Sequence, residues 1–301
     1  MASVKDWITA FRLRTLFLAV ATVVLGGALA LHDGGFNTTT FLLTLVLAVS
    51  IQILANLAND LGDFQKGTDT TGRRQGPMRT LQSGRISSRE MKAAIALFST
   101  VCAVTGLSLI FKITPYISRS SFLLLIVVGA MSILAALFYT LGKHAYGYRG
   151  WGDLFAFFFF GPVPVIGSYF LHTHTAGFQP VLPAIGIGII STMILNINNM
   201  RDIENDRASG KITLAVKLGI RGAKIYHAGL TVLSFLCFLG YSTLYGPWPW
   251  YRYLYLLVFL LLFRILDEIR PKNGRALDPY LKLTSLSGFL LAIAFSICIN
   301  S

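Results

Sequence analysis

Nine apolar runs, each long enough to cross a lipid bilayer, constrain the fold of this chain more than any other feature. A membrane-spanning helix needs about 20 consecutive, mostly apolar residues. We expect such helices at about 15–31, 41–59, 93–113, 120–141, 151–171, 180–200, 222–243, 249–268 and 280–299. The pattern predicts an all-α, polytopic membrane protein. Gly161-Pro162 should kink the fifth span.

The composition excludes the soluble alternatives. Charged residues make up 13% of the chain and hydrophobic residues 54%. Soluble domains carry about 25% charged residues, so the polar surface here is too small to cover a globule. The hydrophobicity excludes disorder, and three widely spaced cysteines exclude a disulfide framework. We interpret residues 1–301 as a single transmembrane domain with motif loops at 56–89, 139–153 and 196–218.

The basic residues sort to one side of the predicted membrane. Of the 26 Lys and Arg residues, 23 fall on the side that carries the N-terminus and the even-numbered loops. The exceptions are Lys112, Arg119 and Arg252. By the positive-inside rule the charged side is cytoplasmic. The net charge of +13 then reflects topology and attraction to anionic lipid or substrate, and it does not indicate nucleic-acid binding.

The first of two acidic motifs follows the second predicted span, in NLANDLGDFQKGTD (56–69). On a helix, Asn56, Asn59 with Asp60, and Asp63 lie on one face because they are three to four residues apart. Carboxylates at the end of a membrane span indicate a function.

The second motif follows the sixth predicted span, in NINNMRDIENDRASGK (196–211). Asn198, Asp202 and Asp206 repeat every four residues, again on one predicted helix face. Both motifs contain N-x-x-x-D and both open a long cytoplasmic loop. This correspondence suggests two four-helix halves related by duplication.

Divalent-metal binding explains both motifs best. Like charges one turn apart destabilise a bare helix, whereas Mg²⁺ is bound by carboxylates together with substrate phosphates. Two opposed motifs could hold Mg²⁺ ions with a diphosphate between them. Helix capping explains either motif alone but poorly explains two at matching positions. Arg79 and Lys211, in neighbouring Gly-containing segments, are candidate phosphate partners.

These strings resemble the UbiA-type intramembrane aromatic prenyltransferase family. The family marks correspond to Asn59-Asp60-Leu-Gly-Asp63, Tyr139-x-x-x-Lys143 and Asp202-x-x-x-Asp206. The longer strings NLANDLGDFQKGTDT, GPMRTLQSG, FFGPVPVIGSYFL and NINNMRDIENDRASGKITLAVKLG are similar to the subgroup that prenylates 1,4-dihydroxy-2-naphthoate in menaquinone biosynthesis. The general family pattern has Asp at position 67, where this chain has Gly67, with the next carboxylate at Asp69. The naphthoate subgroup shares this spacing.

The resemblance implies nine helices around a central cavity in the bacterial cytoplasmic (inner) membrane, with the active site toward the cytoplasm. It implies Mg²⁺ as the cofactor, a polyprenyl diphosphate and 1,4-dihydroxy-2-naphthoate as substrates, and membrane lipid but no nucleic acid as a partner. The reaction it implies is transfer of the polyprenyl group with loss of diphosphate and CO₂, which gives demethylmenaquinol.

The resemblance also assigns roles to individual residues. The expected metal ligands are Asn59, Asp60, Asp63, Asn198, Asp202 and Asp206. The expected diphosphate-binding residues are Arg79, Lys143, Lys211 and Asn56. The expected catalytic residues are Asp60, Asp63, Asp202, Asp206, Lys143 and Tyr139. Tyr139, Tyr146 and the run at 157–160 are candidates for stabilising an allylic cation through their aromatic faces.

Two alternatives remain open at this stage. The acceptor could be another aromatic acid such as 4-hydroxybenzoate or homogentisate, because the shape of the pocket sets acceptor choice. From a different class, a secondary transporter would also carry intramembrane carboxylates, but near the bilayer midplane. In this chain the carboxylates cluster at one membrane interface. A lipid-phosphate transferase would need D-x-x-D-G-x-x-A-R, which the sequence lacks.

Overall fold

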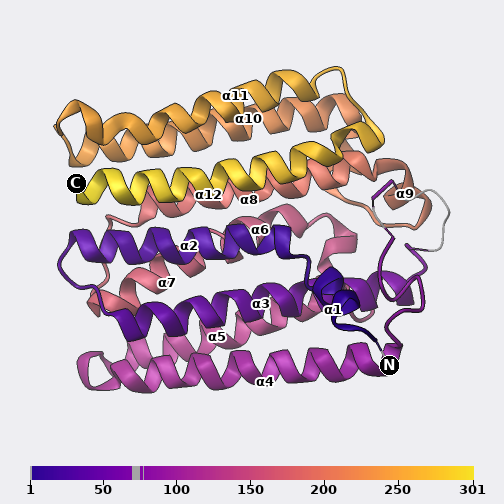
Figure 1. Ribbon diagram of the computed structural model, residues 1–301, viewed down its shortest axis with the longest axis horizontal. Coiled ribbons are helices and arrows are strands. Elements are labelled where there is room, and N and C mark those ends of the chain that lie inside the picture. Colours follow the sequence, from indigo (N-terminus) through magenta and orange to yellow (C-terminus); the bar gives the residue numbers. More distant parts are fainter. Residues whose placement is uncertain (1, 70–74, 77) are drawn as a thin grey trace.

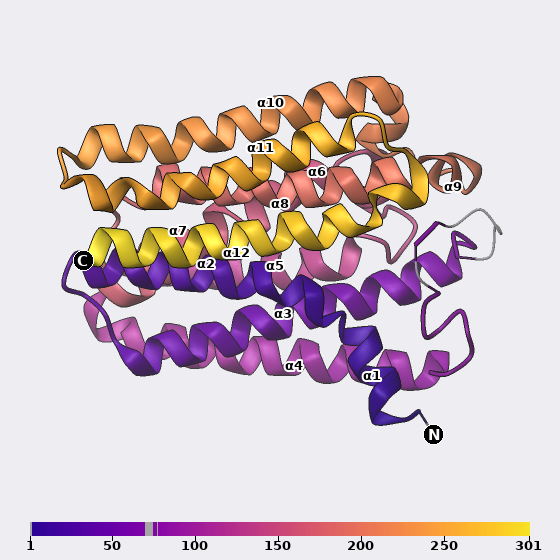
Figure 2. The same cartoon turned by 45° about the horizontal axis from the view of Figure 1, so that its top comes forward.

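A computed structural model describes residues 2–69, 75–76 and 78–301, and within these ranges the chain forms helices and turns but no strand. The long helices lie side by side along one direction (Figure 1). Helices α1 and α9 lie at one end of this bundle, and the C-terminus lies at the other end (Figures 1 and 2). The expected all-α class is confirmed.

Twelve α-helices and four short 3₁₀ segments make up the described fold. The longer helices are α2 (Leu13–His32), α3 (Thr38–Gln65), α4 (Ser88–Ile113), α5 (Arg119–Phe138), α7 (Pro162–Thr173), α8 (Val181–Arg201), α10 (Leu214–Tyr245), α11 (Val258–Ile269) and α12 (Asp278–Asn300). The short helices are α1 (Val4–Phe11), α6 (Gly152–Phe159) and α9 (Ile203–Ala208). The 3₁₀ segments are η1 (Thr114–Tyr116), η2 (Tyr146–Arg149), η3 (Trp250–Leu257) and η4 (Gly274–Leu277).

Eight helical segments of the described chain are long and apolar enough to cross a membrane, so the expected count of nine is not confirmed. The difference lies at the expected span 249–268. There the chain divides into η3 and α11, and neither part alone reaches spanning length. Together they run beside α10, and the two chain ends lie at opposite ends of the bundle (Figure 1). The exposed apolar side chains of the outer helices, such as Leu124 on α5, fit a multi-pass membrane protein.

The expected break at Gly161-Pro162 is confirmed. Helix α6 ends at Phe159 and α7 begins at Pro162, where the missing N–H of proline costs no hydrogen bond. Gly161 lies against Gly188 of α8, and an added Cβ would come within 2.5 Å of the Gly188 Cα. The close approach brings α6 onto α8, the most buried of the candidate spans.

The N-terminal segment forms a separate helix across one end of the bundle. A capping box between Ser3 and Asp6 begins α1. Helix α1 ends at Arg12, whose φ of 52° is left-handed and rare for a residue with a side chain. The chain turns there into α2, and the Arg12 side chain reaches Asp60 of α3. The turn therefore carries a basic side chain to the first acidic motif.

Candidate active site

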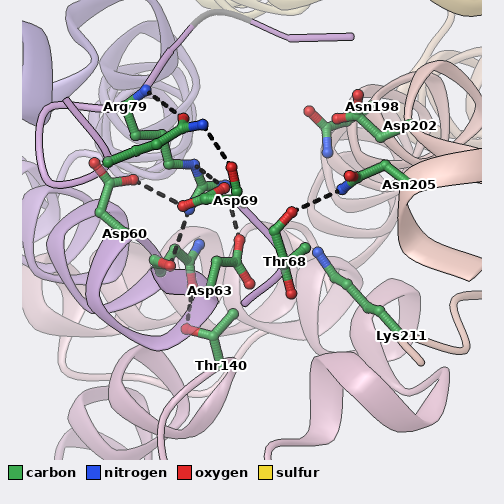
Figure 3. Close-up of polar contacts among 12 residues, drawn as sticks. Asp60, Asp63, Thr68, Asp69, Arg79, Thr140, Asn198, Asp202, Asn205 and Lys211 are labelled. Carbon is green, nitrogen blue, oxygen red and sulfur yellow. Dashed lines mark hydrogen bonds and ion pairs between the residues drawn. The ribbon is translucent and has the colours of Figure 1, made fainter. Parts of the chain in front are cut away.

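The last two turns of α3 and the segment after it gather three buried carboxylates around one guanidinium (Figure 3). Arg79 Nη1 lies 3.2 Å from Asp60 Oδ1, and Arg79 Nη2 lies 2.8 Å from Asp63 Oδ2. Its Nε lies 3.6 Å from Asp69 Oδ1. All three carboxylates are 2% exposed or less. Buried charges of one sign need such a counter-charge, since desolvation would otherwise make them very costly.

The electrostatics of this cluster keep Arg79 charged. Burial alone would lower the pKa of Arg79, but the carboxylates of Asp63, Asp60 and Asp69 outweigh it and raise the pKa above its ordinary value. Arg79 also donates from Nη1 to the main-chain oxygen of Asn59, at 2.9 Å. These three carboxylates (Asp60, Asp63 and Asp69), called the α3 motif below, therefore form a concentrated anionic site with the Arg79 guanidinium at its centre.

The second motif differs from the expected continuous helix. Helix α8 ends at Arg201, Asp202 adopts φ −100° and ψ 14°, and α9 follows as a separate short helix. The expectation of one helix through Asp206 is therefore wrong. The hydrogen bonds from Asp202 N to Asn198 O (3.1 Å) and from Asp206 N to Asp202 O (2.8 Å) persist across the break. Consequently the four-residue spacing still keeps the motif together.

Two cations lie within the second motif. The Arg201 guanidinium is 2.6 Å from Asp202 Oδ2 and donates to Asn198 Oδ1 at 2.8 Å. It also pairs with Asp278 at the start of α12, at 2.5 Å. Lys211 Nζ lies 3.8 Å from Asp206 Oδ1. The two carboxylates of the second motif thus pair with two different cations, Asp202 with Arg201 and Asp206 with Lys211.

The two motifs face each other across a narrow gap. Figure 3 places Asp60, Asp63 and Asp69 on one side and Asn198, Asp202 and Lys211 on the other, with Thr68 between them. Asn205 Nδ2 donates to the Thr68 main-chain oxygen at 3.3 Å, which joins the two motif segments. Burial would lower the pKa of Lys211, but Asp63 and then Asp206 raise it above its ordinary value. The Lys211 ammonium therefore interacts electrostatically with carboxylates of both motifs.

The predicted motif loop 139–153 closes one side of the site. Thr140 Oγ1 donates to the Ala58 main-chain oxygen at 3.0 Å, and Gly62 packs directly against Thr140. An added Cβ at Gly62 would lie 2.4 Å from Thr140 Oγ1, so only glycine allows this approach. Tyr148 donates to Asp63 Oδ1 at 2.8 Å. Burial, and secondarily Asp63, raises the pKa of Tyr148, which keeps its phenol protonated.

A cavity of about 900 Å³ opens from the polar site into the helix bundle. Asn59, Asp63 and Lys211 line its polar end, and most of the remaining wall is apolar. Its lining residues come from α1 to α8, from α12 and from the segments that connect the helices. A long apolar chain with an anionic head group fits this combination of walls.

Aromatic rings line the wall of the cavity near its polar end. Tyr139 and Tyr146 meet edge to face at 5.3 Å between centroids, and Tyr146 stacks on Phe155 at 3.9 Å. Phe155 stacks in turn on Phe159 at 5.8 Å. Of the predicted run 157–160, only residues 159 and 160 line the cavity. Burial raises the pKa of Tyr139 to about 12, so its phenol is neutral at physiological pH.

Most of the predicted site residues meet in this region, but four do not line the cavity wall, namely Asn56, Lys143, Asp202 and Asp206. Asp202 and Asp206 lie directly behind the lining residues, paired with Arg201 and Lys211. Lys143 is exposed in the loop after α5. Asn56 is buried, and its amide donates to the Phe11 main-chain oxygen and to Thr15 Oγ1, both at 2.9 Å. Neither lines the cavity.

Sequence reasoning gave no role to Arg12, Arg201 or Tyr148, which contact the motifs in the structure. Arg201 directly precedes Asp202, so its position next to the motif was a usable signal. Arg12 is 48 residues from its partner Asp60, and no local spacing indicates that contact.

The donor groups at this site fit a divalent cation that arrives with a phosphate ligand. The side chains of both motifs offer carboxylate and amide oxygens, the donors that Mg²⁺ prefers. In the described part of the chain, no group of three or more Asp, Glu, His or Cys side chains is placed to hold a metal by itself. A site with one or two carboxylates per ion, completed by phosphate oxygens, requires no such group.

The fold and the site define a multi-pass membrane protein in which an apolar cavity ends at opposed acidic and basic side chains. The chain belongs to the UbiA prenyltransferase family, which matches residues 19–293, and it is a prenyltransferase. The 1,4-dihydroxy-2-naphthoate octaprenyltransferase of Escherichia coli (strain K12) is 38% identical over 294 residues, which cover 97% of this chain and 94% of that protein. The enzyme of that name from Mycobacterium tuberculosis is 34% identical over 299 residues, covering 98% and 96%.

Two solved structures share the fold. A UbiA homolog from Archaeoglobus fulgidus bound to GPP and Mg²⁺ aligns with a TM-score of 0.68 at 13% identity, over 98% of this chain and all of that one (100%). The apo structure of a UbiA homolog from Aeropyrum pernix K1 aligns with a TM-score of 0.66 at 18% identity, over 95% of each chain. The expected family is confirmed.

Proposed function

We propose that this protein transfers a polyprenyl group from polyprenyl diphosphate to 1,4-dihydroxy-2-naphthoate, with loss of diphosphate and CO₂, to give demethylmenaquinol. The observation that carries the proposal is the opposition of the two acidic motifs at the polar end of the apolar cavity (Figure 3). The names of the curated relatives support the naphthoate acceptor.

The polar end of the site binds the diphosphate. Asn59, Asp60, Asp63, Asn198, Asp202 and Asp206 are the proposed Mg²⁺ ligands. When bound, Mg²⁺ supplies positive charge that stabilises the leaving diphosphate as the allylic C1–O bond breaks. Arg79 and Lys211 donate to diphosphate oxygens and offset the same charge. We leave Lys143 and Asn56 out of this set, because Lys143 is exposed in the loop after α5 and the Asn56 amide donates to the Phe11 main-chain oxygen and to Thr15 Oγ1.

The aromatic wall protects and stabilises the reacting carbon. Tyr139, Tyr146 and Phe155 present ring faces or edges beside the polar end. Ring faces attract a cation by about 0.5–2 kcal/mol each, and their apolar bodies exclude water that would trap it. The electron-rich naphthoate ring then forms the new carbon–carbon bond at C1. The neutral phenol of Tyr139 orients the acceptor by hydrogen bonding, without a change of its own charge.

The whole chain acts as one transmembrane domain, residues 1–301, in a bacterial cytoplasmic membrane. Helices α1 and α9 gather at the same end of the bundle as the motif segments (Figures 1 and 2). The excess of basic residues at that end supports a cytoplasmic active site. A soluble acceptor acid could then enter from the cytoplasm while the prenyl donor remains in the membrane.

The test is a parallel assay of the purified protein in nanodiscs with a polyprenyl diphosphate and Mg²⁺. One reaction contains 1,4-dihydroxy-2-naphthoate and the other 4-hydroxybenzoate, and mass spectrometry identifies the product. We expect a prenylated, decarboxylated naphthoquinol that EDTA abolishes and added Mg²⁺ restores. Product from 4-hydroxybenzoate alone would overturn the acceptor and retain prenyl transfer. An active protein indifferent to EDTA would overturn the metal assignment.

A further inference from the structure

Tyr148, in η2 (Tyr146–Arg149), contacts the α3 motif through its hydroxyl group. The phenol donates to Asp63 Oδ1 at 2.8 Å, and Thr68 Oγ1 lies 2.5 Å from the same phenol oxygen. A phenol has one proton to donate, so the Thr68 hydroxyl must donate to Tyr148. The result is a directed chain from Thr68 through Tyr148 to Asp63, in which each hydrogen bond polarises the next.

The same side chain contacts the second motif segment through its ring. Lys211 Nζ lies 5.6 Å from the centroid of the Tyr148 ring, and Lys66 Nζ lies 4.8 Å from it. Both distances are in the range of cation–π contacts. Since Lys211 also lies 3.8 Å from Asp206, the ring helps to fix an ammonium group that borders both motifs.

The main chain holds Tyr148 in this position. Its carbonyl oxygen accepts from Ile212 N at 3.1 Å, directly after Lys211, and its N–H donates to Ala145 O at 3.2 Å. Lys66 donates in turn to the Thr140 main-chain oxygen at 2.8 Å, which ties the end of α3 to the same loop. Tyr148 is thus connected through its backbone to one motif segment and through its hydroxyl to the other.

We propose that Tyr148 is a positioning residue that sets the spacing between Asp63 and Lys211 across the active site. The inference rests on the proposed function, which assigns Asp63 to the metal and Lys211 to the diphosphate. The hydroxyl orients the carboxylate oxygens of Asp63, and the ring orients the Lys211 ammonium. Groups that orient metal ligands by hydrogen bonding typically change metal affinity by about 10- to 100-fold when they are removed.

Two substitutions separate the two contacts. Tyr148→Phe keeps the ring and removes the hydroxyl, so it should raise the Mg²⁺ concentration for half-maximal activity about tenfold. The KM for prenyl diphosphate at saturating Mg²⁺ should change less than twofold. Tyr148→Leu removes the ring too and should raise this KM about tenfold as well. Tyr116→Phe, on the exposed η1 segment, is the matched control and should match wild type.

A binding measurement without turnover accompanies the kinetics. Isothermal titration calorimetry would follow a non-hydrolysable farnesyl thiodiphosphate at several Mg²⁺ concentrations. Tyr148→Phe should bind it more weakly than wild type at low Mg²⁺ and equally at high Mg²⁺. Thr68→Val, which removes the donor to Tyr148, should shift binding in the same direction by a smaller factor and replaces Tyr148→Phe if that variant does not fold.

The outcomes distinguish this inference from the proposed function. If wild type transfers prenyl groups and Tyr148→Phe equals it in Mg²⁺ requirement and in ligand affinity, the positioning role is wrong and the proposed function stands. If a uniform loss at every Mg²⁺ concentration is seen, the hydroxyl acts on general stability and the inference is again overturned. Wild type that neither binds the thiodiphosphate nor transfers prenyl groups would overturn both.

Discussion

The two acidic motifs share the spacing N-x-x-x-D but neutralise their charge in different ways. At the end of α3, three carboxylates converge on the guanidinium of Arg79, and Asp60 also pairs with Arg12. At the end of α8, Asp202 pairs with Arg201 and Asp206 with Lys211. One motif therefore concentrates negative charge, and the other distributes it. Equal spacing in a sequence therefore does not imply equal electrostatics in the fold.

The difference suggests that the two motifs have different roles in the proposed reaction. A concentrated anionic cluster attracts a divalent cation most strongly, because the cation interacts with several carboxylates at short range. The second motif combines carboxylates with Lys211, whose ammonium borders the gap. It is suited to bind the diphosphate and the metal ions together.

Removing one carboxylate from either motif should have the largest effect. Asp63→Asn and Asp206→Asn should each lower kcat by about a thousandfold, about 4 kcal/mol in activation free energy, because both motifs hold the metal–diphosphate unit. Single-turnover assays in nanodiscs would measure the loss. Glu204→Gln, at an exposed carboxylate of α9 between Asp202 and Asp206 in the sequence, is the control and should retain activity. Near-normal turnover in Asp206→Asn alone would reduce the site to the α3 motif.

Removing the central cation of the α3 motif should have the next largest effect. Arg79→Ala should lower kcat/KM for the prenyl donor by about a hundredfold, since a charge-assisted contact to diphosphate is lost. It should also lower Tm in the absence of Mg²⁺, because three buried carboxylates lose a shared cationic partner. Mg²⁺ should raise the Tm of the variant more than that of wild type.

The control for this prediction is Arg85→Ala, in the same segment but exposed and paired with Asp6. It should leave both kcat/KM and Tm nearly unchanged. An Arg79→Ala protein whose Tm does not respond to Mg²⁺ would show that the α3 carboxylates do not form a metal site.

A change in backbone spacing at the α3 motif should have a smaller effect. Gly62→Ala places a Cβ 2.4 Å from Thr140 Oγ1, so the loop that carries Tyr139 must shift. We expect kcat to fall about tenfold, because small displacements of reacting groups are costly. Gly229→Ala, with open space around the new Cβ, should not change kcat. Equal rates in the two variants would mean that the contact between α3 and this loop does not position the site.

The substitution Tyr139→Phe should have the smallest effect on the pH dependence of kcat. Burial raises the pKa of Tyr139 from 10.0 to about 12, so the folded state favours the neutral phenol. The contribution of this group to stability is therefore complete below pH 10 and is lost as the pH rises toward 12. Tyr139→Phe should keep the shape of the kcat profile from pH 6 to about pH 9. An alkaline limb in this range that the substitution removes would contradict a neutral role for Tyr139.

The sequence predicts the helical membrane fold and most of the site, because apolar runs and carboxylates at span ends are local features. The sequence does not predict those features that depend on contacts between distant parts of the chain. The span at 249–268 divides into η3 and α11, and α8 ends before Asp202. Arg12 reaches Asp60 only because a left-handed residue turns α1 into α2.

The loop 139–153 also shows that spacing in the sequence does not predict which side chains reach the site. The spacing Tyr139-x-x-x-Lys143 groups two residues that the structure separates, since Tyr139 lines the cavity and Lys143 is exposed. Tyr148, five residues beyond Lys143, contacts Asp63 instead. The turn after α5 decides which side chain faces the site, and no spacing rule for a single helix describes that turn.

Joint binding of metal and diphosphate by the two motifs can be tested by a Mn²⁺ titration followed by electron paramagnetic resonance, with and without a non-hydrolysable prenyl diphosphate. If the opposed motifs hold the diphosphate and the metal jointly, the analogue should tighten Mn²⁺ binding by at least about tenfold. Either Asp63→Asn or Asp206→Asn should abolish this gain. A gain that survives both substitutions, or Mn²⁺ binding that is unaffected by the analogue, would contradict joint binding by the two motifs.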